Sequence, residues 1–162
     1  MDAFGKDESR EVRSAAIQNC HLTDQRVLSE IAIREGVEKE EQLLVGAKLG
    51  PALLSVNKLN DQKSLAEVSR RGRDPLVRRA AVEKITSPLV LSEIARTDKD
   101  KSVRWCAVNN PHFIDQIMLA EVAKKDSDSL VGKEALEKVF DQTLLAELAT
   151  EDACQNCPES NS

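Results

Sequence analysis

The chain has 162 residues, of which 41% are hydrophobic and 31% charged, and its formal net charge is −5. This acidic balance argues against a generic nucleic-acid-binding protein, and a composition with three Phe, one Trp and no Tyr argues against an aromatic-lined ligand pocket. No apolar run approaches the ~20 residues of a membrane span, and the N-terminus lacks the apolar stretch of a secretory signal, so we expect a cytoplasmic protein without membrane contact.

The first predicted unit, residues 7–35, contains two short amphipathic helices. The first helix follows the N-cap candidate Ser9 and places Val12 and Ile17 on one apolar face. The second helix follows the N-cap candidate Asp24 and carries an apolar stripe that begins at Leu28. Asp and Ser suit these positions because their side-chain oxygens accept hydrogen bonds from the unpaired N–H groups of the first turn.

The second of these helices recurs throughout the chain. The same phrase, Leu-Ser/Ala-Glu-apolar-Ala/Ser, begins five times, with its leading leucines 37, 26, 28 and 26 residues apart. An Asp stands four residues before each leucine, except that the third copy has Ser87 followed by Pro88. Proline is tolerated at the first helical position, so each helix is predicted to begin one residue after its cap. The leading leucines are Leu28, Leu65, Leu91, Leu119 and Leu145.

The second unit, residues 36–73, is the longest. Its first helix aligns with residues 51–59, and the extra residues lie in an insertion at 36–50. The insertion contains Leu43, Leu44 and Ala47, which predict an additional short helix or helical turn. Gly46 and the Gly-Pro pair at 50–51 are expected to separate it from the helix that follows.

The last three units span residues 74–99, 100–127 and 128–152. Their first helices are predicted to follow the N-caps Asp74, Asp100 and Asp128. Residues 1–152 are therefore interpreted as one domain of five repeats, and residues 153–162 as a polar tail that we expect to be disordered. A helix of about ten residues is unstable alone in water. The repeats must then bury their apolar stripes against one another, which predicts an all-α solenoid of about five two-helix repeats of 26–28 residues.

The phrase over residues 74–85, Asp-Pro-Leu-Val-Arg-Arg-Ala-Ala-Val-Glu-Lys-Ile, resembles the HEAT-like repeats of the armadillo-type superhelix. The short period is also similar to the leucine-rich-variant repeat, in which one helix can be 3₁₀. The resemblance covers roughly residues 7–152. It implies a right-handed α–α superhelix, and it implies little about function because such repeats serve many roles.

Two charged positions recur with the repeat. A row of glutamates on the second helices could bind cations or a basic partner. However, arginine or lysine follows three or four residues later in four of the five copies, which favours ion pairs within the helix and a structural role. The arginine that follows the first valine of the first helix, Arg13, Arg78 or Arg104, is likewise expected to pair with an acid or a cap of the adjacent repeat. The glutamates are Glu30, Glu67, Glu93, Glu121 and Glu147.

A basic cluster is the strongest candidate for a binding site. Residues 70–84 carry a net charge of +4 in a chain of −5. Such a cluster could hold an acidic protein segment, a phosphate or a nucleic-acid backbone, and the alternative is a solvated edge with pairs inside the repeat. The absence of interleaved aromatics argues against base stacking. The candidate binding residues are Arg70, Arg71, Arg73, Arg78 and Arg79.

No catalytic or metal-binding constellation emerges. Cys154 and Cys157 form half of a zinc motif, whereas Cys20 and Cys106 occupy apolar repeat positions and are interpreted as core residues. His21 and His112 lie in loops without a local nucleophile. We therefore expect no cofactor, no metal and no enzymatic activity.

The leading hypothesis is a protein–protein interaction or scaffold module with an unidentified protein partner. One alternative is phosphate or nucleic-acid binding through residues 70–84, which the overall acidity disfavours. Another is an accessory to a cofactor-attaching lyase, suggested by a resemblance of the repeat to the HEAT-like lyases that attach bilins.

Overall fold

The computed structural model describes residues 10–19, 21–35 and 50–155. Within these ranges every regular element is an α-helix, with no strand and no 3₁₀ helix, which confirms the all-α prediction. Residues 36–49 of the insertion, residues 156–162 of the predicted tail and Cys20 lie outside the described residues. The first three residues of the predicted tail, 153–155, are helical and not disordered, because the last helix runs to Gln155. The helices are α2 (Arg10–Gln18), α3 (Gln25–Arg34), α5 (Pro51–Lys58), α6 (Gln62–Arg71), α7 (Pro75–Val82), α8 (Pro88–Thr97), α9 (Lys101–Asn109), α10 (Gln116–Lys125), α11 (Ser129–Glu137) and α12 (Gln142–Gln155).

The helix starts lie where the capping pattern predicts them. The helices α3, α6, α8, α10 and α12 each begin one residue after the expected N-cap, as do α7, α9 and α11. The Asp24 carboxylate accepts a hydrogen bond of 2.9 Å from the backbone N–H of Arg26, and the Asp74 carboxylate accepts one of 2.8 Å from Leu76. Ser87 makes no side-chain capping bond, and Pro88 begins α8 with its φ already near the helical value.

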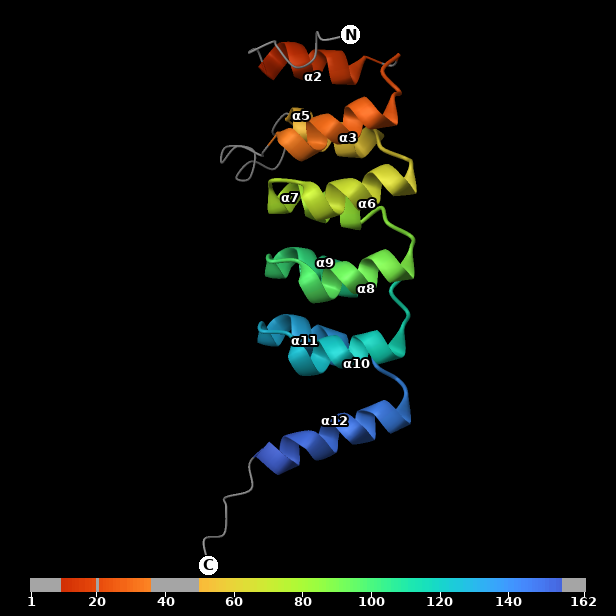
Figure 1. Ribbon diagram of the computed structural model, residues 1–162, viewed down its shortest axis with the longest axis vertical. Coiled ribbons are helices and arrows are strands. Elements are labelled where there is room, and N and C mark those ends of the chain that lie inside the picture. Colours follow the sequence, from red (N-terminus) through yellow and green to blue (C-terminus); the bar gives the residue numbers. More distant parts are fainter. Residues whose placement is uncertain (1–9, 20, 36–49, 156–162) are drawn as a thin grey trace, which may run out of the picture.

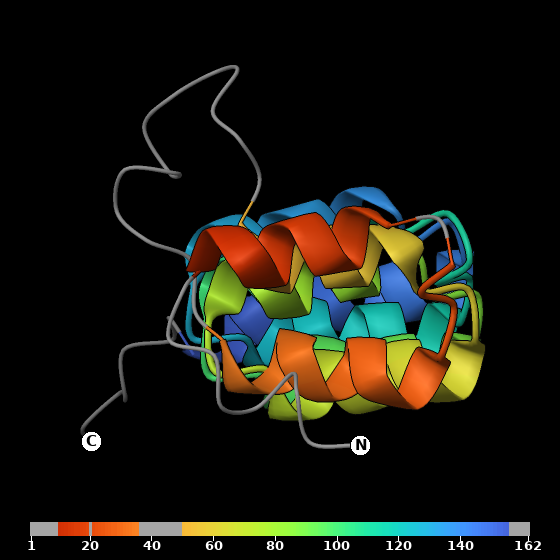
Figure 2. The same cartoon turned by 90° about the horizontal axis from the view of Figure 1, so that it is seen from above.

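The helices form layers that are stacked along one axis. We call the first helix of each repeat helix A (α2, α5, α7, α9 and α11) and the second helix B (α3, α6, α8, α10 and α12). The helices α3, α6, α8 and α10 each pack most extensively against the helix A that follows, and helices of the same type contact each other along the stack. Figure 1 shows α3 with α5, α6 with α7, α8 with α9 and α10 with α11 as successive layers, and α2 and α12 at the two ends. Viewed from above, the A helices and the B helices form two parallel rows (Figure 2).

The repeated apolar positions meet in one continuous core between the two rows. Four of the five leading leucines are almost completely buried, with exposed fractions of 0–1%, and the fifth, Leu145 in the end helix α12, is half-buried. The valines that begin the stripe of helix A behave alike: Val77, Val103 and Val131 are buried, whereas Val12 in the other end helix is exposed. Burial therefore depends on a neighbouring layer, as nearest-neighbour stacking of repeats requires.

Arginines of helix A link the layers by ion pairs, which are buried for Arg78 and Arg104 and partly exposed for Arg13. The guanidinium of Arg78 donates two hydrogen bonds, of 2.8 and 2.9 Å, to the carboxylate of Asp98, the residue that ends α8. Arg104 does the same to Asp126 with bonds of 2.7 and 2.8 Å, and Arg13 contacts Glu35 at 2.6 Å. The predicted pairing of these arginines with an acid is confirmed, but the acid belongs to the same repeat and not to the adjacent one, since the pairs lie within residues 7–35, 74–99 and 100–127. Their acid is the residue directly after the next helix B.

A second ladder of hydrogen bonds joins the ends of successive A helices. The ammonium of Lys84 donates to the backbone carbonyls of Val56, Asn57 and Leu59. Lys58 and Asn110 occupy the equivalent repeat position, and each donates to two carbonyls at the end of the preceding helix A or in the connection that follows it. These side chains satisfy carbonyl groups that a helix C-terminus leaves without intrahelical partners, so the polar ends of the layers are fixed to one another.

Candidate binding surface

The candidate arginines of residues 70–84 lie on two sides of the stack. Arg70 and Arg71 end helix B α6, Arg73 lies in the turn that follows, and Arg78 and Arg79 belong to helix A α7. Arg78 is 2% exposed and is held by Asp98, and it also donates a bond of 3.0 Å to the carbonyl of Gly72. Its guanidinium is therefore part of the core and is not accessible to a partner.

Two of the exposed arginines have carboxylate partners at the surface of the B helices. Arg70 donates bonds of 3.0 and 2.6 Å to Glu93 of the next helix B, α8. These bonds lower the pKa of Glu93 and raise that of Arg70. Arg71 pairs with Glu67 one turn earlier in its own helix. Exposed pairs of this kind contribute only ~0.2–1 kcal/mol each, so a competing anionic ligand can displace them at little cost.

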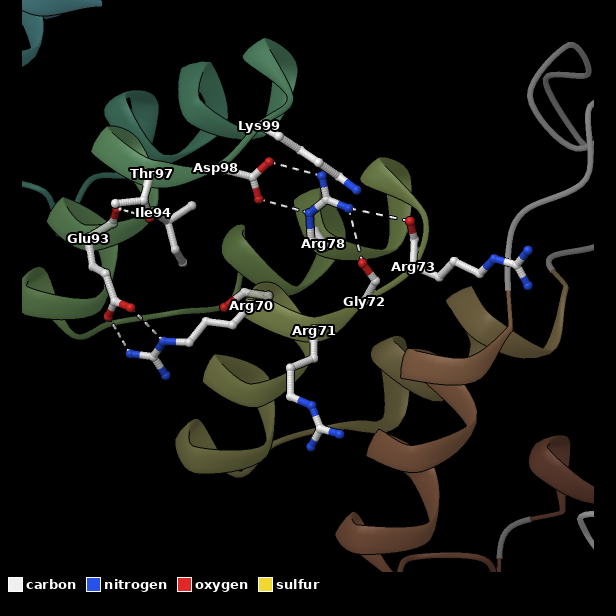
Figure 3. Close-up of a pocket in the computed structure, with 11 residues that line it drawn as sticks. Arg70, Arg71, Gly72, Arg73, Arg78, Glu93, Ile94, Thr97, Asp98 and Lys99 are labelled. Atoms are coloured by element: carbon white, nitrogen blue, oxygen red, sulfur yellow. Dashed lines mark hydrogen bonds and ion pairs between the residues drawn. The ribbon is translucent and has the colours of Figure 1, made fainter.

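A hollow of about 500 Å³ lies between the C-terminal ends of α6 and α8. Figure 3 shows the Arg78–Asp98 pair in its middle, the Arg70–Glu93 pair at one side, and Arg71 and Arg73 extending away from it in different directions. Lys99, from the turn after α8, reaches into the same region. Arg73 and Lys99 are exposed, and neither forms an ion pair with a carboxylate of the described residues. They are the cations of this hollow that are available to a ligand.

A second hollow, of about 670 Å³, lies between α3 and α6 and shares Arg71 with the first. The two hollows therefore form one surface across α3, α6 and α8, which we call the B-face groove. Its lining has eight cationic and five anionic side chains, and seven cations and four anions remain without the buried Arg78–Asp98 pair, which is an excess of positive charge in an acidic chain. The cations are Arg26, Arg34, Lys63, Arg70, Arg71, Arg73, Arg78 and Lys99, and the anions are Glu30, Asp61, Glu67, Glu93 and Asp98.

The glutamate row follows the B-face groove and continues beyond it. Three of its members pair with a cation four residues later, as predicted: Glu30 with Arg34, Glu67 with Arg71 and Glu121 with Lys125. Glu93 instead pairs with Arg70 of the preceding helix B, and Arg96 reaches Glu121 of the following one at 3.6 Å. The prediction of pairing within each helix was thus incomplete, because the short spacing between stacked B helices also permits pairs between layers. No ion pair involves Glu147 among the residues that the structure describes.

Arg79 lies on the opposite side of the molecule, away from the other candidate arginines. It pairs with Glu83 at 3.5 Å and lines a third hollow of about 410 Å³ on the A helices, together with Trp105 and Leu130. The candidate arginines that share one accessible surface are therefore Arg70, Arg71 and Arg73. Lys99, which sequence analysis did not select, lies with them. Arg73 and Lys99 occupy the same turn position in successive repeats. This equivalence is the sequence signal from which Lys99 could have been predicted.

The remaining candidate catalytic or metal-binding residues do not cluster in the described part of the chain. Cys106 is buried as predicted, and burial raises the pKa of its thiol to about 11. His21 and His112 are exposed, while Cys157 and the side chain of Cys154 lie outside the described part of the chain. In that part, no group of three His, Cys, Asp or Glu residues is arranged to hold a metal ion.

Comparisons of the chain with models of protein families, with curated protein sequences and with solved structures found no match. No helix in the described residues is long and apolar enough to cross a membrane. Function is therefore inferred from the geometry of the stack and from the charges of its surface.

Proposed function

We propose that the chain is a short right-handed α–α superhelix of HEAT-like type that acts as a non-enzymatic protein-binding module. Support for the hand comes from the path of the chain in Figures 1 and 2. It passes from helices A at the back, through connections on the right, to helices B at the front while it descends. A clockwise path that recedes from the viewer is a right-handed coil. Support for the repeat type comes from the equivalent burial and pairing of successive units.

We propose the B-face groove as the binding surface, and an acidic segment of a protein as its ligand. The single observation that carries this proposal is the cationic lining of two adjoining hollows in a chain of net charge −5. Arg73 and Lys99 are exposed without carboxylate partners in the described residues, and the surface pairs of Arg70 and Arg71 are weak enough to exchange. Arginine favours carboxylates because its planar guanidinium donates two parallel hydrogen bonds to them.

The test is fluorescence anisotropy with a labelled Glu-rich peptide and the full chain at low and moderate salt. We expect binding that weakens as salt is added, and a loss of about two- to thirtyfold in the Arg71→Ser/Arg73→Ser variant, since each exposed pair with a carboxylate contributes ~0.2–1 kcal/mol. The matched control is Arg79→Ser/Lys133→Ser, which removes two exposed cations from the A helices and should leave binding unchanged. No binding at low salt, or an equal loss in both variants, would refute the proposal.

The second candidate ligand is a phosphate backbone, because the same cations would bind it. Single-stranded and duplex DNA of matched charge provide the comparison in the same assay. Tighter binding of DNA than of the acidic peptide, again lost in Arg71→Ser/Arg73→Ser, would favour the nucleic-acid function over the protein-binding one.

A further inference from the structure

At one repeat position of the B helices, the residue type changes from cationic to apolar along the stack. Along α3, α6, α8 and α10 the second residue of helix B is Arg26, Lys63, Leu89 and Ile117 in turn, and the end helix α12 has the polar Thr143 at this position. Successive B helices contact each other, so these equivalent side chains form a row with one member in each layer. The row is cationic in its first half, where Arg26 and Lys63 line the B-face groove, and apolar in its second half.

The apolar half of the row is exposed to an extent that the fold does not require. Leu89 is 78% exposed and Ile117 is 65% exposed. The residues just before the N-caps of α10 and α12, Ile114 and Phe140, add two more exposed apolar side chains at the same ends of the B helices. A single exposed leucine is ordinary in a soluble protein, but apolar groups on neighbouring layers of one edge mark an interaction surface.

The cationic half of the row does not stabilise the helices that carry it. Arg26 and Lys63 lie in the first turns of α3 and α6, where the partial positive charge of the helix N-terminus disfavours a cation. Neither side chain forms an ion pair within 4 Å with a carboxylate of the described residues. Both halves of the row therefore carry residue types that suit a ligand better than they suit the isolated chain.

We infer that the row binds one extended protein segment with an acidic half and an apolar half. The carboxylates of the segment would lie over Arg26 and Lys63, and its apolar side chains would lie over Leu89 and Ile117. Neighbouring helices are ~8–10 Å apart, so the four layers span ~25–30 Å, and an extended segment of about eight or nine residues covers that length. This inference rests on the proposed function and adds to it the composition, the order and the length of the ligand.

The test compares two labelled peptides of that length by fluorescence anisotropy. The bipartite peptide has glutamates in one half and leucine or phenylalanine in the other, prepared in both orders, and the reference peptide replaces the apolar residues by serine. We expect the better bipartite order to bind about tenfold more tightly than the reference, because burial of one large apolar side chain contributes that much. Equal affinity of all three peptides for the wild-type chain would overturn the inference.

Variants separate this inference from the proposed function. Leu89→Ser/Ile117→Ser should abolish the advantage of the bipartite peptide and leave the reference affinity unchanged, while Leu130→Ser, an exposed apolar residue of the A helices, should change neither. If the bipartite peptide still binds the Leu89→Ser/Ile117→Ser variant more tightly than the reference peptide does, the inference is wrong. Failure of the reference peptide itself to bind the wild-type chain would refute the proposed function. Circular dichroism of each variant checks that the helices are retained. We expect them to be retained because the substituted side chains are exposed.

Discussion

Removal of the carboxylate of Asp98 should destabilise the protein more than any surface charge substitution. The side chains of Arg78 and Asp98 are 3% and 8% exposed, and two hydrogen bonds join them. In Asp98→Ala the guanidinium stays buried, with only backbone carbonyls such as that of Gly72 as acceptors. Breaking a buried ion pair from one side costs ~3–5 kcal/mol, which is a large part of the ~5–15 kcal/mol by which a domain is stable.

The assay is equilibrium unfolding in urea, followed by circular dichroism. Glu67→Ala is the matched control, because it breaks the exposed pair with Arg71 and should cost at most ~0.5 kcal/mol. The double variant Arg78→Met/Asp98→Leu should be more stable than Asp98→Ala, since it leaves no buried charge without a partner. If Asp98→Ala costs no more than Glu67→Ala, or if the double variant is the less stable of the two, the structural role assigned to this pair is wrong.

Three further predictions concern pH, the ladder of helix ends and the core. Burial raises the pKa of Asp126, but hydrogen bonds from a buried guanidinium and a backbone N–H bring it below its usual value. The stability that Asp126 contributes is thus present above about pH 4 and is lost as the pH falls through its folded pKa. Urea unfolding should show a smaller loss between pH 5 and pH 2 in Asp126→Asn than in the wild type, and an equal loss would contradict the assignment. Lys84→Leu should lower the free energy of unfolding by ~1–3 kcal/mol, and Lys84→Asn by less, because Asn110 makes the equivalent contacts one repeat later; equal losses in urea unfolding would argue against the ladder. Leu91→Ala should cost ~2–5 kcal/mol and Leu145→Ala clearly less, since only Leu91 has a layer on both sides; matching changes in the urea midpoint would show that burial by neighbouring layers is not the cause.

Some of the ion pairs between helix A arginines and the acids after helix B could have been predicted from the repeat sequence. The three copies with an arginine in helix A have an acid after helix B: Glu35, Asp98 or Asp126. The copy that has Ala52 at the arginine position has Gly72 at the acid position. A side chain at Gly72 would also meet neighbours, because its Cβ would lie 2.8 Å from the carbonyl oxygen of Val68 and 3.0 Å from Arg78 Cγ. The arginine and the acid thus occur together in three copies and are both absent from the second, whereas the fifth copy has Gly132 at the arginine position and Asp152 at the acid position.

The sequence by itself determined where the helices begin and which of their faces are apolar. Both properties are local: a cap acts on the N–H groups of the next turn, and an apolar stripe depends only on spacing along one helix. Asp74 followed by Pro75 and Asp24 followed by Gln25 therefore predict the starts of α7 and α3 without knowledge of any other residue.

Only the tertiary structure decided which charged residues share a surface. Neighbours along a helix point in directions about 100° apart, so Arg78 enters the core and Arg79 faces the A-helix hollow, although they are adjacent in the sequence. Arg73 and Lys99 come to the same hollow from different repeats because stacking places equivalent turns in adjacent layers. The B-face groove is a property of the stack, since no single repeat contains all the side chains that line it.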